Sequence, residues 1–268
     1  MNSLDAAELT NRCHRLRSLH QPGAPLLLPN VWDVATARAV VTAGFPVVAT
    51  TSWGVAASLG YEDHEGAPAS EMLAVAARIS RCVDVPLTVD AEAGYGMEPE
   101  VLVAALRDAG AAGCNLEDTY YSPGTVHDHA AGILRDPTRQ AEWLRSVRQA
   151  AEEHDYPLVI NARLDNFLSP FIRGEAGTQR KLVPEALERA SAYIEAGADC
   201  VYPIALWEPD ALGRFMSDVH GPVNVTRVPQ VSSVADLAAL GVSRVSWALY
   251  LYFASMAHFE EQLRSIKE

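Results

Sequence analysis

Short apolar runs alternate with amphipathic stretches along almost the whole chain. The apolar runs are continuous and often β-branched, as expected for parallel strands that are buried on both faces. Eight runs are candidate strands: Pro25–Leu28, Pro46–Thr50, Pro86–Asp90, Gly113–Glu117, Leu158–Ala162, Cys200–Pro203, Val223–Thr226 and Arg244–Trp247. Since eight strand–helix units follow one another without a break in composition, the pattern predicts an α/β fold, a (β/α)8 TIM barrel formed as one domain by residues 1–268.

The amphipathic stretches between the strands are the candidate helices. They are Val34–Ala43, Ser70–Cys82, Pro99–Ala109, Thr138–His154, Pro184–Ala196, Pro209–Val219 and Ser233–Leu240, with a short N-terminal helix before them and the helical segment Leu249–Ile266 after the last strand. A glycine follows several of these helices directly, as at Ala109-Gly110 and Ala196-Gly197, where a C-terminal cap favours positive φ. A doubly wound open sheet would instead carry a glycine-rich phosphate loop after its first strand, and none is present.

Composition and charge narrow the class of protein. A chain of 268 residues with 49% hydrophobic and 21% charged residues suits one folded barrel, which typically needs about 250 residues. The net charge of -13 would repel phosphate backbones and anionic lipid, so we expect neither nucleic acid nor a membrane as partner. The N-terminus lacks the apolar region of a signal peptide, and no apolar run approaches the ~20 residues that span a bilayer, so we expect a cytoplasmic protein.

Carboxylates gather at the carboxyl ends of consecutive candidate strands, where barrels of this kind place their active sites. The polar residues at these ends are Asn30, Asp33, Thr51, Ser52, Asp63, Asp90, Glu92, Glu117, Asp118, Arg163 and Asp165. Any one of the carboxylates could simply cap a helix or lie in a loop. Several converging on one rim would repel one another unless protons or a cation such as Mg²⁺ intervened. Arg163 would bind a substrate carboxylate, or would form a structural ion pair with Asp165 or Glu117.

Four motifs resemble the isocitrate lyase/phosphoenolpyruvate mutase superfamily. They are the glycine-rich stretch Asp90-Ala-Glu-Ala-Gly-Tyr-Gly96, the Leu116-Glu-Asp118 and Ile160-Asn-Ala-Arg163 strand ends, and Ser58-Leu-Gly-Tyr-Glu-Asp63. The resemblance implies Mg²⁺, with Mn²⁺ as a substitute, and a small 2-oxo or 2-hydroxy acid as substrate. It also implies a homo-oligomer, a dimer or tetramer in which the last helix is exchanged between subunits; the ordinary alternative is that this helix packs on its own barrel.

The resemblance further implies roles for individual residues. Four carboxylates would surround the metal: Asp63, Asp90, Glu92 and Glu117. Substrate binding would fall to Thr51, Ser52, Trp53, Asp63, Arg163 and Asn224, and Arg163 and Tyr61 would take part in catalysis. The roles of Tyr61 and Asn224 rest on weaker grounds, and either residue could instead pack or cap a loop.

One loop departs from the family pattern. Lyases of the superfamily carry a Lys-x-Cys-Gly-His motif after the fourth strand, whereas the loop Asp118-Thr-Tyr-Tyr-Ser-Pro-Gly-Thr-Val-His-Asp-His129 has neither Lys nor Cys. The mutases use a Lys in this loop and a His after the sixth strand, where this chain has Pro203. His127 and His129 are therefore the candidate proton carriers, with a solvated loop tip as the alternative.

Three functions remain open at this point. The leading hypothesis is a Mg²⁺-dependent lyase that cleaves or forms a C–C bond in a small 2-oxo or 2-hydroxy carboxylate through an enolate. The second is P–C bond chemistry of the phosphonomutase or phosphonopyruvate hydrolase kind, against which the weakly cationic rim argues. The third is a non-catalytic barrel that binds a 2-oxo acid.

Overall fold

The computed structural model describes residues 5–120, 132–175, 177–228 and 233–266. Parallel strands form two sheets, with the orders β2-β3-β4-β5-β8-β9 and β1-β11-β10. The strands are β1 (Leu26–Leu28), β2 (Asn30–Val31), β3 (Val48–Thr50), β4 (Leu87–Asp90), β5 (Gly113–Glu117), β8 (Val159–Leu164), β9 (Cys200–Pro203), β10 (Asn224–Thr226) and β11 (Arg244–Ser246).

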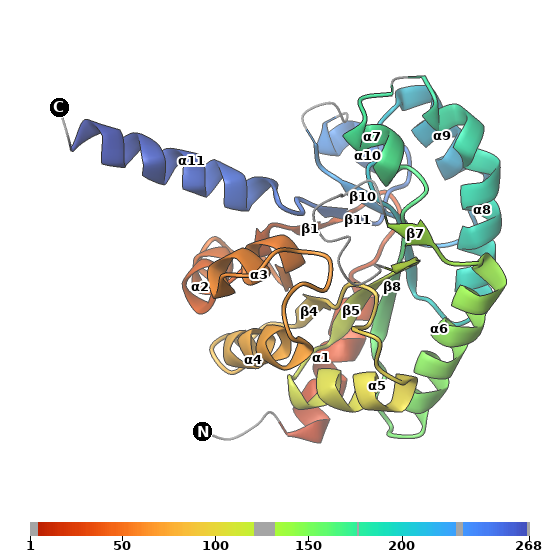
Figure 1. Ribbon diagram of the computed structural model, residues 1–268. Helices are drawn as coiled ribbons and strands as arrows, with labels where there is room; N and C mark the ends of the chain where they lie inside the picture. Colours follow the sequence, from red (N-terminus) through yellow and green to blue (C-terminus); the bar gives the residue numbers. More distant parts are fainter. Residues whose placement is uncertain (1–4, 121–131, 176, 229–232, 267–268) are drawn as a thin grey trace.

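Two links join these sheets into a ring. Val201 in β9 forms a parallel bridge with Val223, which directly precedes β10. Only Pro29 separates β1 from β2. Strand β1 lies within the first candidate strand, and β2 continues the chain directly after it, so the two together occupy one strand position. Because pairing then passes around eight strand positions, the protein has the predicted (β/α)8 barrel architecture (Figure 1).

Helices lie outside the strands (Figure 1). They are α1 (Ala6–Ser18), α2 (Val34–Thr42), α3 (Ser52–Leu59), α4 (Ala69–Ser80), α5 (Pro99–Asp108), α6 (Pro137–Glu152), α7 (Leu168–Ile172), α8 (Gln179–Glu195), α9 (Pro209–Asp218), α10 (Val234–Ala239) and α11 (Tyr250–Ser265). The glycine after α8, Gly197, has a φ of +103°, and a Cβ there would lie 2.8 Å from the Arg148 side chain, so this cap also packs against α6. Among the described residues, no helix combines the length and apolar character needed to cross a membrane.

The structure contains elements that the sequence pattern did not predict. Helices α3 and α7 occupy segments expected to be loops, and β6 (Thr119–Tyr120) pairs antiparallel with β7 (Ile133–Leu134). Helix α8 begins at Gln179, five residues before the predicted start, and contains Pro184 in its second turn. Helices α3 and α7 and strands β6 and β7 are so short that they show too few repeats for a periodicity to be read from the sequence.

The last helix, α11, extends away from the barrel (Figure 1). None of its residues is buried, although its first turn contacts the barrel through the ring pairs Trp32–Tyr252 and Trp53–Phe253, at centroid distances of 5.1 and 5.4 Å. Phe259 and Leu263 further along are 55% and 45% exposed. The alternative, in which this helix packs along its length on its own barrel, is not what the structure shows, because none of its residues is buried.

Candidate active site

A cavity of about 220 Å³ opens at the carboxyl ends of the barrel strands. Six of the predicted site residues line it: Thr51, Ser52, Trp53, Asp63, Asp90 and Arg163. They come from the ends of β3, β4 and β8, from the start of α3 and from the loop after it. The barrel thus brings together residues that lie more than a hundred positions apart in the sequence, at the end of the fold where active sites of this architecture form.

Asp90 ends β4 and lies beside the N-terminus of α3. Its Oδ2 accepts a hydrogen bond from the Ser52 backbone N–H at 3.1 Å, and its own N–H donates to Thr50 Oγ1 at 2.8 Å. The other carboxylate oxygen, Oδ1, is buried and has no hydrogen-bond partner in the described part of the chain. Burial raises the pKa of Asp90, while Arg163 opposes that shift. Asp90 therefore offers one buried oxygen to a proton or a cation.

Glu92 lies just beyond the strand, in an unusual backbone conformation. Its φ is +48°, which a residue with a side chain rarely adopts, and its Oε1 accepts from the Glu65 N–H at 2.5 Å. Glu65 Oε1 accepts in turn from the Tyr95 N–H at 2.6 Å, which ties the loop after α3 to the glycine-rich turn. Burial, and next the charge of Asp63, raise the pKa of Glu92 to about 8.

Arg163 is held between two carboxylates. Its Nη1 lies 2.5 Å from Glu117 Oε2, while its Nε and Nη2 donate to the two oxygens of Asp165 at 2.6 and 3.2 Å. The structural ion pairs considered as an alternative to substrate binding are thus present, although Arg163 also lines the cavity. Glu117 is buried, and burial raises its pKa well above the ordinary range in spite of Arg163. Its second oxygen, Oε1, has no hydrogen-bond partner among the described residues.

Other predicted residues lie away from the cavity. The Tyr61 hydroxyl is on the surface and donates to Glu71 Oε1 at 2.9 Å. Asn224 is fully buried, and its Nδ2 donates to Ser246 Oγ at 3.3 Å. Neither of these two residues lines the cavity. His127 and His129 lie outside the described residues.

The cavity also contains polar residues that sequence analysis missed. Asn115, Tyr202 and Ser246 line it, and the Tyr202 hydroxyl lies 2.6 Å from Thr226 Oγ1. Gly113, Asn115 and Glu117 occupy alternate positions of β5. Since alternate residues of a strand face the same side, the position of Glu117 contained a signal for Asn115. Tyr202 and Ser246 gave no such signal, because each lies within an apolar segment.

The predicted metal shell can be tested against this geometry. In the described ranges, no three His, Cys, Asp or Glu side chains are grouped so that they could hold a metal ion together. Glu117 faces Arg163, and Glu92 faces the Glu65 N–H. Asp90 Oδ1 is nevertheless a buried oxygen of the kind that Mg²⁺ prefers, and Mg²⁺ usually keeps several water ligands. The buried oxygen of Asp90 therefore fits a cation, with Asp63, Glu92 and Glu117 as candidates to hold its water ligands.

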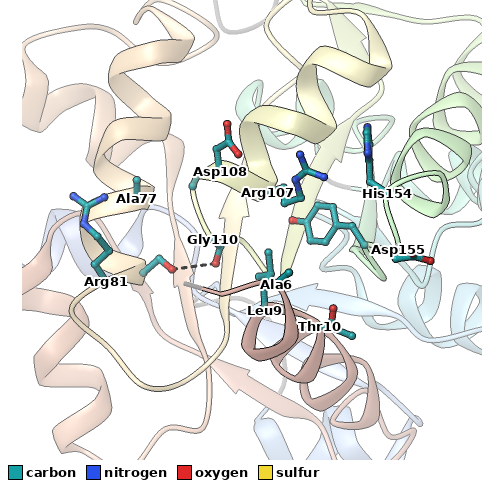
Figure 2. Close-up of a pocket in the computed structure, with 13 residues that line it drawn as sticks. Ala6, Leu9, Thr10, Ala77, Arg81, Arg107, Asp108, Gly110, His154 and Asp155 are labelled. Atoms are coloured by element: carbon teal, nitrogen blue, oxygen red, sulfur yellow. Dashed lines mark hydrogen bonds between the residues drawn. The ribbon is translucent and has the colours of Figure 1, made fainter. Parts of the chain in front are cut away.

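A second cavity lies at the opposite end of the barrel, near the amino ends of the strands. It has a volume of about 400 Å³, and Figure 2 shows Arg81, Arg107 and His154 around it together with Asp108 and Asp155. Its Ser80 hydroxyl donates to the Gly110 carbonyl at 3.1 Å. Although this cavity is larger, it contains none of the predicted site residues, and it lies at the end of the barrel where residues serve stability rather than chemistry.

The amino-acid sequence matches a known protein family over most of its length. The family model described as "Phosphoenolpyruvate phosphomutase" matches residues 16–267, which is nearly the whole chain. The protein belongs to the phosphoenolpyruvate phosphomutase family. Membership confirms the resemblance that the strand-end motifs indicated. The match includes the loop that departs from the lyase and mutase patterns.

Individual relatives of this family member include both lyases and mutases by name. "Probable 2-methylisocitrate lyase 2" of Corynebacterium glutamicum is 30% identical over 89% of this chain and 75% of its own length. "2,3-dimethylmalate lyase" of Eubacterium barkeri is 30% identical over 86% of this chain and 78% of its own length. A solved structure described as "a putative phosphonomutase from Burkholderia cenocepacia J2315" is 38% identical with a TM-score of 0.84, covering 95% of this chain and 99% of its own.

Proposed function

We propose that this protein is a Mg²⁺-dependent lyase that cleaves or forms a C–C bond in a small 2-oxo or 2-hydroxy carboxylate through an enolate. One observation carries the proposal: the buried free oxygen of Asp90 and the oriented guanidinium of Arg163 line the same small cavity. A cation site beside a guanidinium can bind both the oxygen at C2 and a carboxylate of such an acid. The relatives named as lyases support the same reaction class.

The size of the cavity and its donors suit a small acid. About 220 Å³ is below the range of roughly 300–1,000 Å³ found for sites that bind drug-sized ligands. Thr51, Ser52 and Trp53 lie at the start of α3, where backbone N–H groups and the helix dipole favour an anion. We assign the substrate carboxylate to this helix end and to Arg163, which is already oriented by Asp165 and Glu117.

When bound, Mg²⁺ (or Mn²⁺) would lower the energy of negative charge on the C2 oxygen of the enolate. Asp90 would hold the ion directly, and Asp63, Glu92 and Glu117 would hold its water ligands. The proton carriers we propose are His127 and His129, in the loop that leaves the barrel after Glu117. Their role stays a prediction, as does that of Tyr61, which would have to leave its Glu71 partner to reach the cavity.

The second candidate is P–C bond chemistry on a phosphonate. Two descriptions favour this candidate: the Burkholderia structure is described as a "putative phosphonomutase", and the family model as "Phosphoenolpyruvate phosphomutase". The site geometry favours the lyase, because Arg163 is already compensated by two carboxylates and would meet a dianionic phosphoryl group poorly. A non-catalytic barrel that binds a 2-oxo acid is the third candidate; binding of oxalate without turnover of any acid would favour it.

The proposal is tested with a panel of C3–C6 oxo and hydroxy acids and phosphonopyruvate, each with Mg²⁺. We expect C–C cleavage of at least one acid, its loss in EDTA and its recovery with Mg²⁺ or Mn²⁺. Asp90→Ala should lower kcat/KM by about 10²-fold or more, as removal of one transition-state contact does, while Asp84→Ala on the exposed surface should leave it unchanged. Unchanged turnover in Asp90→Ala would refute the metal assignment, and phosphate release from phosphonopyruvate would favour the second candidate.

We also propose that the protein is a cytoplasmic homo-oligomer, a dimer or tetramer, joined through α11. The exposed apolar side chains along this helix support an interface with another copy of the chain. We expect a small carboxylate as the ligand and neither nucleic acid nor membrane as a partner, in line with the net charge of -13.

A further inference from the structure

A fully buried arginine donates a hydrogen bond to a residue that lines the cavity. Arg244, the first residue of β11, is 1% exposed. Its Nη2 donates to Asn115 Oδ1 at 3.0 Å, whereas its Nε and Nη1 have no hydrogen-bond partner in the described part of the chain. No described carboxylate forms an ion pair with it. A buried charge of this kind costs several kcal/mol, so its retention in a barrel core calls for a physical reason.

The contact with Arg244 determines the orientation of the Asn115 amide. Asn115 Oδ1 accepts from Arg244 Nη2 at 3.0 Å and from Asn161 Nδ2 at 2.8 Å. A guanidinium has donors but no acceptor, so the amide atom that faces Arg244 must be the oxygen, and the usual ambiguity between amide O and N is removed. The Asn115 N–H₂ group then occupies the other branch of the amide, away from Arg244.

This N–H₂ group is available to a ligand. Asn115 lines the cavity, and its Nδ2 makes no hydrogen bond with the described residues. In the sheet register Asn115 pairs with Asp90 of β4 on one side and with Asn161 of β8 on the other. The donor is therefore placed in the same layer of the barrel as the proposed metal ligand.

We propose that Arg244 is a positioning residue that holds Asn115 as an N–H donor toward an acceptor oxygen of the substrate. The inference rests on the proposed function, for which that oxygen is the carbonyl, carboxylate or enolate oxygen of the bound acid. A fixed amide donor binds an enolate oxygen more strongly than a neutral carbonyl, because the hydrogen bond strengthens as negative charge develops. Arg244 adds a positive charge beneath this oxygen and does not itself line the cavity.

Two substitutions test the inference by isothermal titration of oxalate in the presence of Mg²⁺. Asn115→Asp gives Arg244 a carboxylate partner but presents an acceptor oxygen to the ligand in place of the donor. Arg244→Met removes the donor that fixes the amide while filling a similar apolar volume. We expect oxalate affinity to fall at least ~10-fold in both variants, which corresponds to about 1.4 kcal/mol. Ser243→Ala, a buried neighbour in the same segment whose hydroxyl has no partner among the described residues, is the matched control.

Thermal denaturation of each variant separates positioning from simple stability. The inference expects the affinity to fall without a fall in the melting temperature. Arg244→Met, which removes a buried charge, should melt at or above the wild-type temperature. Wild-type oxalate affinity in either folded variant overturns the inference and leaves the proposed function standing. Absence of oxalate binding by the wild type overturns the proposed function, and the inference with it.

Discussion

Burial decides the charge state of the individual carboxylates around the cavity. It is the largest cause of the raised pKa of Asp90, of Glu92 and of Glu117. In each case the neighbouring carboxylates add to the shift, because like charges in a poorly solvated site favour the protonated form. Arg163 compensates part of this charge for Asp90 and Glu117, but it is not among the main influences on Glu92. Without a cation, Glu92, whose pKa is about 8, therefore stays protonated over most of the neutral range.

Glu92 gives this charge state a measurable consequence. Its pKa rises from an ordinary 4.5 to about 8, so the folded protein favours the protonated form. The resulting loss of stability is absent below pH 4.5, grows as the pH rises and is complete above pH 8. In EDTA, we expect Glu92→Gln, which imitates the protonated acid, to melt roughly 4 °C or more above the wild type at pH 8.5 and at nearly the same temperature at pH 4.5. A difference that is equal at both pH values would contradict this account.

At the scale of elements, Glu117, which ends β5, and Asp118, which follows it, have different partners. Glu117 faces Arg163 at the cavity, whereas Asp118 faces helix α8. Asp118 Oδ2 accepts from Arg189 Nη1 at 3.1 Å and from the Tyr193 hydroxyl at 2.8 Å, and its Oδ1 accepts from the Asp165 N–H at 2.9 Å. Asp118 thus fixes α8 to the ends of β5 and β8, on which the site residues stand.

This assignment predicts a loss of stability when Asp118 is removed. Asp118→Ala should lower the free energy of unfolding by about 3 kcal/mol or more, because Arg189 is left buried without this partner. The exposed pair Arg214–Asp218, with an N–O distance of 3.9 Å, provides the control. Arg214→Ala should cost no more than ~1 kcal/mol. Equal effects of the two variants in urea denaturation would show that the Asp118 network is not an anchor.

At the scale of the whole molecule, one helix, α11, projects from the barrel and buries none of its residues (Figure 1). Phe259 and Leu263 on α11 are about half exposed, and Ile266 just beyond the helix is 78% exposed. An apolar helix surface of this kind is typical of an interface between proteins. In our proposed homo-oligomer, a second copy of the chain covers this apolar surface of α11.

We therefore expect light scattering to show a dimer or tetramer at micromolar concentration. Replacing both Phe259 and Leu263 by Asp should convert it to a monomer, because two charges would then have to be buried in the interface. Ser265→Asp, which adds a charge on the same helix without removing an apolar side chain, should leave the assembly intact. A wild-type monomer would contradict the proposed assembly.

Much of the fold and part of the site follow from the sequence alone. The continuous apolar runs determined the eight strand positions, because strands buried on both faces tolerate few polar residues. Since carboxyl ends of barrel strands meet at one rim, the positions of Asp90 and Arg163 after such runs were enough to place both at one cavity. The motifs at the strand ends also indicated the family, and the family match confirms this resemblance.

Only the tertiary structure decided which side chains pair and which remain available. Arg163 lies between Glu117 and Asp165, Tyr61 bonds to Glu71 on the surface, and the buried Arg244 donates a hydrogen bond to Asn115 in the cavity lining. These outcomes depend on contacts between residues far apart in the chain and on the burial of each group. Periodicity reports the face on which a residue lies, but hydrogen bonding and desolvation depend on what the other strands bring to that face.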